Sequence, residues 1–180
     1  MKITELKVGT ELKYEYGPVL REGITRYAFA SGDRNNIHTN DDFAEEMGLK
    51  GVISHGLYSY SMVARCLDDI AGDEGQLLKI AGQMRGMVRP GDVWLITLKV
   101  TAINGDLVDF EYTEESKTPI KITKDGAIVK KFEAEERGWV TEKDIAKGFL
   151  KTEEVAEGTL HFRLRTAIPG TATLRMVNGH

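Results

Sequence analysis

The sequence predicts an α+β fold in which an antiparallel sheet wraps around one long buried helix. Residues 56–71 form the strongest helical segment, and almost no polar face is left on it, which is typical of a buried helix. The helix is followed by four strand-like segments, at 77–88, 93–103, 107–113 and 127–134. Asn-Gly and Asp-Gly turns join the later segments and are strong hairpin signals. The simplest packing of these elements places the helix inside the sheet.

The segment before the central helix predicts a strand and two short helices. Residues 10–16 alternate as a strand does, and Gly17-Pro18 closes them. Residues 22–30 carry a helical pattern that ends at Ser31-Gly32. A second helix is expected after Asn40, an N-cap residue type, and Gly48 ends it.

Composition and charge indicate a folded globular protein and argue against nucleic-acid-binding, membrane and secreted classes. The chain has 180 residues, of which 41% are hydrophobic and 29% charged, which favours a folded globular domain. Its net charge of −4 argues against a nucleic-acid partner, which a strongly basic surface would recognise. There is no apolar run of membrane-spanning length and no secretory core after Met1. The single cysteine, Cys66, excludes an intrachain disulfide, so we expect a cytoplasmic protein with no membrane partner.

The end of the chain differs from the rest. Residues 133–157 are rich in acidic side chains, whereas residues 158–180 contain no Asp or Glu. We therefore expect a domain over residues 1–134 and a C-terminal extension over 135–180. The extension is predicted to hold a short helix near 141–149 and then a hairpin whose turn is residues 168–171.

Alternation within the extension predicts which side chains are buried. Leu160, Phe162 and Leu164 share one strand face and are expected to pack on the domain or on a partner. Arg163 and Arg165 share the other face. They are expected to meet solvent, the acidic 133–157 segment, or the phosphates of a ligand.

Two segments could carry chemistry. In residues 27–38, Asp33 and His38 place a carboxylate and an imidazole on one irregular loop, where they could share proton transfers. Asn35 can brace that loop. The same residues are also ordinary turn and cap chemistry, and both interpretations stay open.

The second segment, 51–57, ends where the central helix begins. Gly56 would leave the first N–H groups of that helix open to a ligand oxygen, as in an oxyanion hole. Alternatively, Gly51, Ser54 and Gly56 only turn and cap the helix while His55 packs beside them.

Together the two segments resemble the MaoC-like, R-specific enoyl-CoA hydratases. The matching residues are Tyr27, Ser31-Gly32-Asp33, Asn35, Ile37-His38, Phe43-Ala44, Ile53 and His55-Gly56-Leu57. The resemblance covers about residues 10–134 and implies the hot dog fold. It also implies that Asp33 and His38 are the catalytic pair and that the Gly56 N–H is the oxyanion donor. Asn36 stands where the family usually has proline.

The resemblance also implies the surroundings of the reaction. Expected substrate-binding residues are Asn35, Ser54, His55, Gln83, Arg85 and Arg89. The last three are on a strand that borders the thioester channel in this fold, although a solvated strand face is the simpler explanation for each of them. No metal or redox cofactor is expected for this reaction. Coenzyme A takes part only as a portion of the substrate. A homodimer or higher homo-oligomer is expected.

The resulting hypothesis is an enzyme, a hydro-lyase that reversibly adds water to a trans-2-enoyl-CoA to give an R-3-hydroxyacyl-CoA. Three alternatives remain: a dehydratase for an unusual acyl-CoA, an acyl-CoA thioesterase, and a non-catalytic acyl-CoA-binding subunit of a hetero-oligomer.

Overall fold

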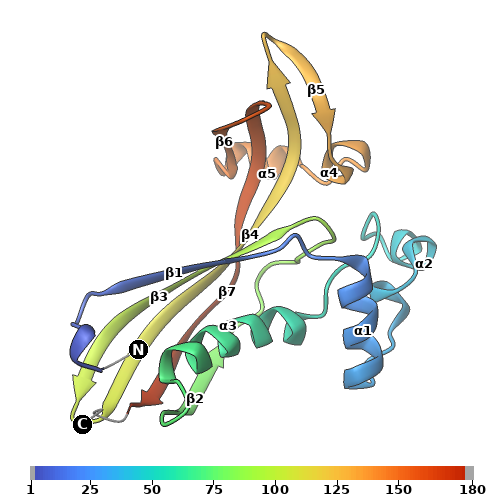
Figure 1. The fold of residues 1–180 in the computed structure, drawn as a ribbon. Helices are drawn as coiled ribbons and strands as arrows, with labels where there is room; N and C mark the ends of the chain where they lie inside the picture. The colour runs from blue at the N-terminus through green and yellow to red at the C-terminus, as the bar shows by residue number, and fades with distance from the viewer. Residues whose placement is uncertain (1–2, 177–180) are drawn as a thin grey trace.

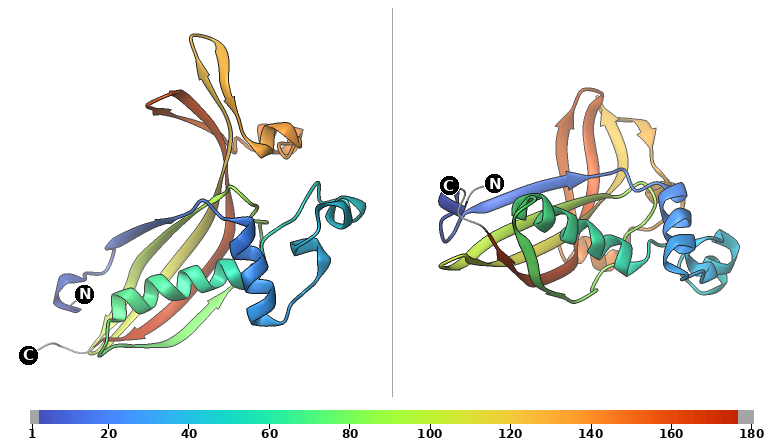
Figure 2. Two further views of the ribbon diagram at one scale, coloured as in Figure 1. Left: turned by 45° about the vertical axis from the view of Figure 1, so that its right-hand side comes forward. Right: turned by 60° about the horizontal axis from the view of Figure 1, so that its bottom comes forward.

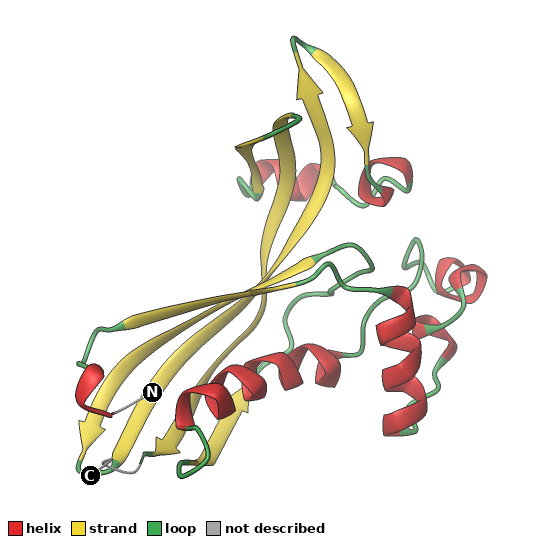
Figure 3. Cartoon of the chain, viewed as in Figure 1, coloured by secondary structure: helices red, strands yellow, loops and turns green. Residues whose placement is uncertain are grey.

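The computed structural model describes residues 3–176 and shows one curled sheet with the longest helix on its concave side (Figures 1 and 3). The strands are β1 (Glu11–Tyr16), β2 (Gln76–Gly82), β3 (Val93–Asn104), β4 (Leu107–Lys124), β5 (Ala127–Lys131), β6 (Leu150–Val155) and β7 (Gly158–Arg175). The helices are α1 (Arg21–Ser31), α2 (Asp41–Glu46), α3 (Gly56–Ala71), α4 (Glu133–Glu136) and α5 (Glu142–Ala146), with 3₁₀ turns at Ile3–Glu5 and Asn36–His38.

The sheet is antiparallel, and its main path runs β1-β3-β4-β7-β2. α3 crosses the concave face of this sheet, as the second view of Figure 2 shows. The predicted helix over 56–71 is confirmed to the residue. The curled antiparallel sheet is that of the hot dog fold, so the predicted fold class is confirmed.

Packing of α3 on the sheet makes the core. The helix contributes fully buried side chains, which meet buried side chains from β3, β4 and β7; the largest of these core residues are Val63, Leu67, Ile70, Ile96, Leu98, Phe110 and Leu174. Burying a large apolar side chain contributes about 1.5–3 kcal/mol. This cluster therefore fixes the position of α3 on the sheet.

β4 and β7 continue well past the sheet into a second lobe (residues 118–164), at the top of Figure 1. Their far halves pair with β5 and β6, and α4 and α5 pack beside them. The second lobe has its own apolar clusters, one around Ile120 and Trp139 and one around Ile122 and Phe162.

The structure corrects the expected boundary of the C-terminal extension. β7 lies between β4 and β2, so residues expected to form an appendage supply a central strand of the main sheet. Residues 168–171 are inside β7 and are not a turn; the strand accommodates Pro169 beside a register shift at Glu114/Glu115. The hairpin is formed instead by β6 and β7, and the short helix expected near 141–149 is present as α5.

The predicted strand over 77–88 is also too long. β2 ends at Gly82, and residues 83–88 form a loop that still follows β7, with Gln83 N–H donating to Pro169 O and Arg85 N–H to Ala167 O. A Cβ on Gly86 would lie 2.6 Å from Thr166 O, so the chain passes too close to β7 for regular pairing.

The apolar face expected within residues 160–164 is buried, in a cluster of the second lobe that is separate from the core of the main sheet. Leu160 and Phe162 are buried against Ile122, and Leu164 packs on the same cluster. Of the three expected surroundings for Arg163 and Arg165, the structure shows the acidic segment, because both guanidinium groups approach the Asp144 carboxylate, at 3.6 and 3.7 Å.

The place of β7 in the core predicts the effect of truncating Leu174. Because its side chain is fully buried, Leu174→Ala should cost about 2–5 kcal/mol of unfolding free energy. Thr171→Ala, at an exposed position of the same strand, is the control and should cost less than about 1 kcal/mol. Urea denaturation measures both. Equal losses would show that β7 is not a core strand.

A buried carboxyl group lies in the same core. Glu114 of β4 is fully buried between Ile96 of β3 and Ile168 of β7, and neither carboxyl oxygen has a hydrogen-bond partner among the described residues. Burial raises the pKa of Glu114 to about 8. The folded protein therefore holds a proton here that the unfolded chain releases.

This proton predicts how stability depends on pH. Between about pH 5 and 8 the folded state binds more protons at Glu114 than the unfolded state, so the unfolding free energy should fall as pH rises, by up to about 1.4 kcal/mol per pH unit. Glu114→Gln should flatten this slope relative to the parent. Glu111→Gln, exposed on the other face of β4, should not. Urea denaturation at several pH values measures both; an unchanged slope in Glu114→Gln contradicts the assignment.

Candidate active site

The end of α1 brings Asp33 and His38 to one place. Gly32 ends the helix in the left-handed region, with φ of 79°, and turns the chain so that Asp33 follows it into solvent. The Asn35 side chain then accepts a hydrogen bond from Ile37 N–H and caps the 3₁₀ turn that carries His38. Asn35 therefore braces the loop, as the sequence predicted, and its contact with a substrate stays a prediction.

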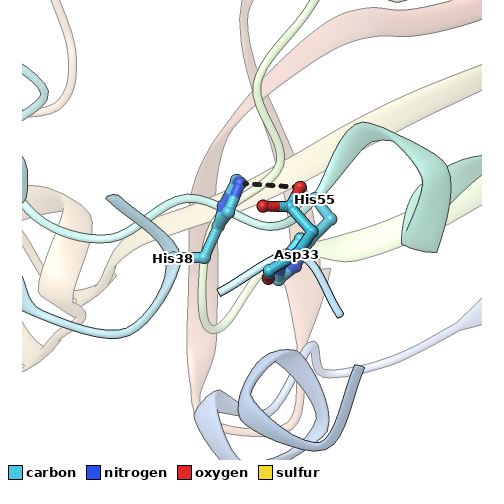
Figure 4. A group of neighbouring side chains, drawn as sticks. All are labelled: Asp33, His38 and His55. Atoms are coloured by element: carbon cyan, nitrogen blue, oxygen red, sulfur yellow. Dashed lines mark hydrogen bonds and ion pairs between the residues drawn. The ribbon is translucent and has the colours of Figure 1, made fainter. Parts of the chain in front are cut away.

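His38 presents one nitrogen to Asp33. Its Nδ1 lies 2.8 Å from Ile53 O, which sets Nδ1 as the protonated nitrogen and leaves the lone pair on Nε2. His38 Nε2 is 4.0 Å from Asp33 Oδ2 (Figure 4). This gap is too long for a direct hydrogen bond, but a single water about 2.8 Å from each atom spans it.

The two side chains differ in burial. The Asp33 side chain is 57% exposed and that of His38 only 9%. Burial lowers the pKa of His38, and the neighbouring His55 adds to this, which outweighs the opposite effects of Ile53 O and Asp33. The imidazole is therefore neutral at neutral pH and able to accept a proton.

His55 lies behind this pair. Its ring stacks on that of His38 with centroids 3.7 Å apart, and its Nε2 donates to the backbone oxygen of Asp33 at 2.9 Å. The ring is almost fully buried, and Tyr27 packs on it at 4.9 Å. His55 therefore supports both members of the pair, and its surface does not open towards a ligand.

Asp33, His38 and His55 each offer a ligand atom within 4.8 Å of the others, so we considered a metal. His38 Nδ1 and His55 Nε2 already contact carbonyl oxygens. The two rings are stacked with an angle of only 26° between their planes, so the lone pairs left on them lie in separate, nearly parallel planes and do not meet at one point. The cluster would need an imidazole to rotate before it could hold a metal ion.

Gly56 begins α3 beside this pair. As the first residue of the helix it has no carbonyl in its own helix to donate to, so its N–H is open to a ligand oxygen. A Cβ on Gly56 would lie 2.4 Å from the Sδ of Met84. The half-exposed Met84 thioether thus lies against Gly56, and any side chain at this position would have to displace that flexible group.

The remaining predicted residues are dispersed. Ser54 is buried and bonded through its N–H to Val88 O, so it holds the chain entering α3. Gln83 and Arg85 bond to each other and line an open cavity of about 590 Å³ beside β4 and β7. Arg89 is buried, and its guanidinium donates to Leu49 O and Gly51 O. This placement gives Arg89 a structural role in the loop before His55.

The second lobe holds the loop between His38 and His55. Arg137, just after α4, pairs with Asp41 at 3.1 Å and with Glu45 at 2.7 Å, both on α2. Asp41 also accepts from Val52 N–H. Burial raises the pKa of Asp41, but the Val52 N–H and the ion pairs with Arg21 and Arg137 outweigh it and hold that pKa below its ordinary value. The carboxylate thus stays charged and connects α2, the second lobe and the irregular segment before His55.

Sequence reasoning missed Met84, Arg137 and Trp139. Met84 lies in a segment predicted as strand, where an exposed methionine carries no signal. Arg137 and Trp139 lie about a hundred residues from α2 in the chain, so no local pattern could pair them. The high density of charged residues in 133–157 was the one signal visible in the sequence. It indicated that this segment forms ion pairs but did not identify α2 as its partner.

The chain belongs to the MaoC-like family. A family model described as "MaoC like domain" matches residues 4–135, well over half of the chain. The match ends before β7, although that strand is part of the main sheet.

Solved structures share the fold at low sequence identity. R-hydratase PhaJ1 from Pseudomonas aeruginosa aligns with a TM-score of 0.66 and 16% identity, covering 98% of this chain and 85% of that one. The ChsH1-ChsH2 complex from Mycobacterium tuberculosis aligns with a TM-score of 0.63 and 17% identity, covering 95% and 98%. At such identities the likeness establishes the fold.

Curated relatives are much longer than this chain. The fatty acid synthase beta subunit hexB of Dothistroma septosporum is 35% identical over 80 residues, which is 43% of this chain and 4% of that protein. The chain thus spans a small part of the length of the relatives it matches. Within residues 3–176, no helix is both long and apolar enough to cross a membrane.

Proposed function

We propose that this protein is an R-specific enoyl-CoA hydratase, which adds water reversibly to a trans-2-enoyl-CoA thioester to give an R-3-hydroxyacyl-CoA. The observation that carries the proposal is the placement of Asp33 Oδ2 4.0 Å from His38 Nε2, with the open N–H of Gly56 at the start of α3 beside them. Membership of the MaoC-like family implies hydro-lyase chemistry in general and supports the class of reaction.

In the proposed mechanism a water occupies the gap between Asp33 and His38. Asp33, a carboxylate, accepts one proton of this water while the oxygen attacks C3 of the enoyl group. His38 holds the water through the lone pair on Nε2. The C2–C3 double bond becomes a single bond, and the pair delivers one proton to C2. The sum is one water added, and in reverse one water eliminated.

The Gly56 N–H would stabilise the charge that develops on the thioester oxygen. Attack at C3 places negative charge on that oxygen as an enolate forms. An N–H at a helix start is pre-oriented and carries the positive end of the helix dipole. For the oxygen to reach it, the Met84 side chain must move aside, which its exposure permits.

The proposed substrate carrier is coenzyme A, and no metal or redox cofactor takes part. The proposed assembly is a homodimer or a higher homo-oligomer in the cytoplasm. β2 supports this, because its outer edge has no partner strand within the described residues. A structural neighbour is a complex of two different chains, so a supporting subunit is the other assembly to test.

The deciding experiment is a panel of acyl-CoA substrates analysed by mass spectrometry. A gain of one water supports the hydratase. Release of free coenzyme A would instead identify a thioesterase, and an unchanged bound ligand a non-catalytic binder.

Substitution of the pair tests the roles of Asp33 and His38. Asp33→Asn and His38→Gln should each lower kcat by about 10²–10⁴-fold, because each removes a proton acceptor. Asp42→Asn, at an exposed position of α2, and His161→Gln, in the second lobe, are matched controls and should retain the parent's kcat. Near-parental kcat in either test variant refutes the assignment.

A bulky residue at Gly56 tests the oxyanion donor. Gly56→Val should lower kcat/KM by about 10²–10³-fold, since it blocks approach to the N–H. Leu57→Val, at the next and exposed position, controls for a β-branched residue at the helix start. Circular dichroism checks that both variants fold. A folded Gly56→Val enzyme with parental kcat/KM excludes this role.

A further inference from the structure

A small basic cavity lies between the loop that precedes His55 and the second lobe. Its volume is about 180 Å³, and its charged lining residues are Lys50, Arg89, Arg163, Arg165 and one carboxylate, Asp144. None of these belongs to the proposed catalytic pair. The cations come from three separate parts of the chain, which only the tertiary fold brings together.

Two of the guanidinium groups are buried and donate their hydrogen bonds to neutral groups. Arg89 is 5% exposed and donates to the carbonyls of Leu49 and Gly51. Arg163 is 4% exposed and donates to Trp139 O at 2.9 Å and Thr118 Oγ1 at 3.3 Å, while its Nε has no partner among the described residues. Carbonyls and hydroxyls satisfy donors but do not neutralise the charge, and a buried charge that is only partly compensated is costly.

The carboxylates nearby balance only part of this charge. Asp144 accepts from the N–H and the hydroxyl of Thr141, at 2.9 and 2.8 Å, and this single carboxylate is shared between two ion pairs, with Arg163 at 3.6 Å and Arg165 at 3.7 Å. Asp92 is buried close to Arg89, and burial raises its pKa to about 7, so it is only partly ionised near neutrality. Burial and the neighbouring Arg163 lower the pKa of Arg89 to about 10, which remains cationic.

Lys50 is held at the rim of the cavity in an uncommon backbone conformation. Its φ is 57°, a left-handed value that few residues other than glycine adopt. The second lobe stabilises it there, because Trp139 Nε1 donates to Lys50 O and Lys50 Nζ donates to Gly138 O, each at 2.8 Å. The ammonium group again bonds to a carbonyl, so its charge is also free for an anion.

We propose that this cavity is a phosphate-binding site in which Arg165 and Lys50 meet the anion and the buried guanidinium groups of Arg163 and Arg89 add positive charge beside it. Arginine donors match phosphate oxygens in geometry and charge, and the volume suits a phosphate group rather than a nucleotide. A phosphate would supply the rest of the countercharge for Arg89 and Arg163.

The cavity is within reach of the proposed active site. Met87 lines it, and Met84, three residues earlier, packs on Gly56. Three residues span at most about 11 Å. A phosphate on the arm of a coenzyme A thioester could therefore bind here while the thioester lies at Gly56. This identification of the phosphate's source rests on the proposed function, whereas the phosphate site itself does not.

Calorimetric titration tests the site without any assay of activity. Inorganic phosphate and coenzyme A are titrated separately into the whole protein at constant ionic strength. Arg165→Gln and Lys50→Gln, at partly exposed positions, should each weaken binding of the bound probe about tenfold or more. Arg175→Gln removes the same charge from an exposed arginine paired with Asp106 and should bind as the parent does. Absence of binding of both probes, or equal loss in the control, overturns the proposal.

Kinetics separate the two sources of phosphate. The KM for an enoyl-CoA should rise about tenfold more in Arg165→Gln than the KM for the matching N-acetylcysteamine thioester, which has no phosphate. Tight binding of inorganic phosphate with equal changes in the two KM values assigns the site to free phosphate. Hydration of neither thioester would refute the proposed function, while the titration would still decide on the phosphate site.

Discussion

Burial of α3 against the curled sheet is the interaction on which the rest of the structure depends. Its apolar side chains meet β3, β4 and β7, and this contact fixes the axis of the helix relative to the sheet. The first N–H of the helix is thereby fixed as well, at the end where α1 and α2 lie (Figure 1). A donor held by a core helix costs little reorganisation when charge develops near it, which suits an oxyanion site.

The proposed catalytic pair is on a less regular segment and needs separate support. Backbone carbonyls orient both histidines, and the His38–His55 stack joins the loop after α1 to the residue before α3. From the other side the second lobe holds α2 through Arg137 and the following loop through Trp139. Each exposed ion pair is weak alone. Together they restrict a loop that has few apolar contacts of its own.

Buried charge is concentrated where the sheet meets the second lobe. The ionisable groups there have little exposure, and because burial disfavours charge it shifts each pKa in the direction that favours the neutral form. It raises the pKa of Glu114 and Asp92 and lowers the pKa of Arg89 and Arg163. The carboxyl groups respond by taking up protons near neutral pH. Arginine would become neutral only by losing a proton, which it does not do near neutral pH. A buried arginine therefore requires either carbonyl partners or an anion. This difference explains why the basic cavity stays cationic between acidic neighbours.

The sequence by itself determined the central helix and most of the strands near it. Periodicity and the flanking glycines gave α3 with its correct ends, and the resemblance to the MaoC-like family joined the segment of Asp33 and His38 to that of Gly56. Tertiary structure alone decided that β7 lies between β4 and β2, that Arg89 turns inward, and that Met84 packs on Gly56. Alternation states which face of a strand is buried but not which strand pairs with it, and the partners here are up to a hundred residues apart. Local patterns reflect short-range backbone preferences, whereas these placements depend on packing between segments remote in the chain.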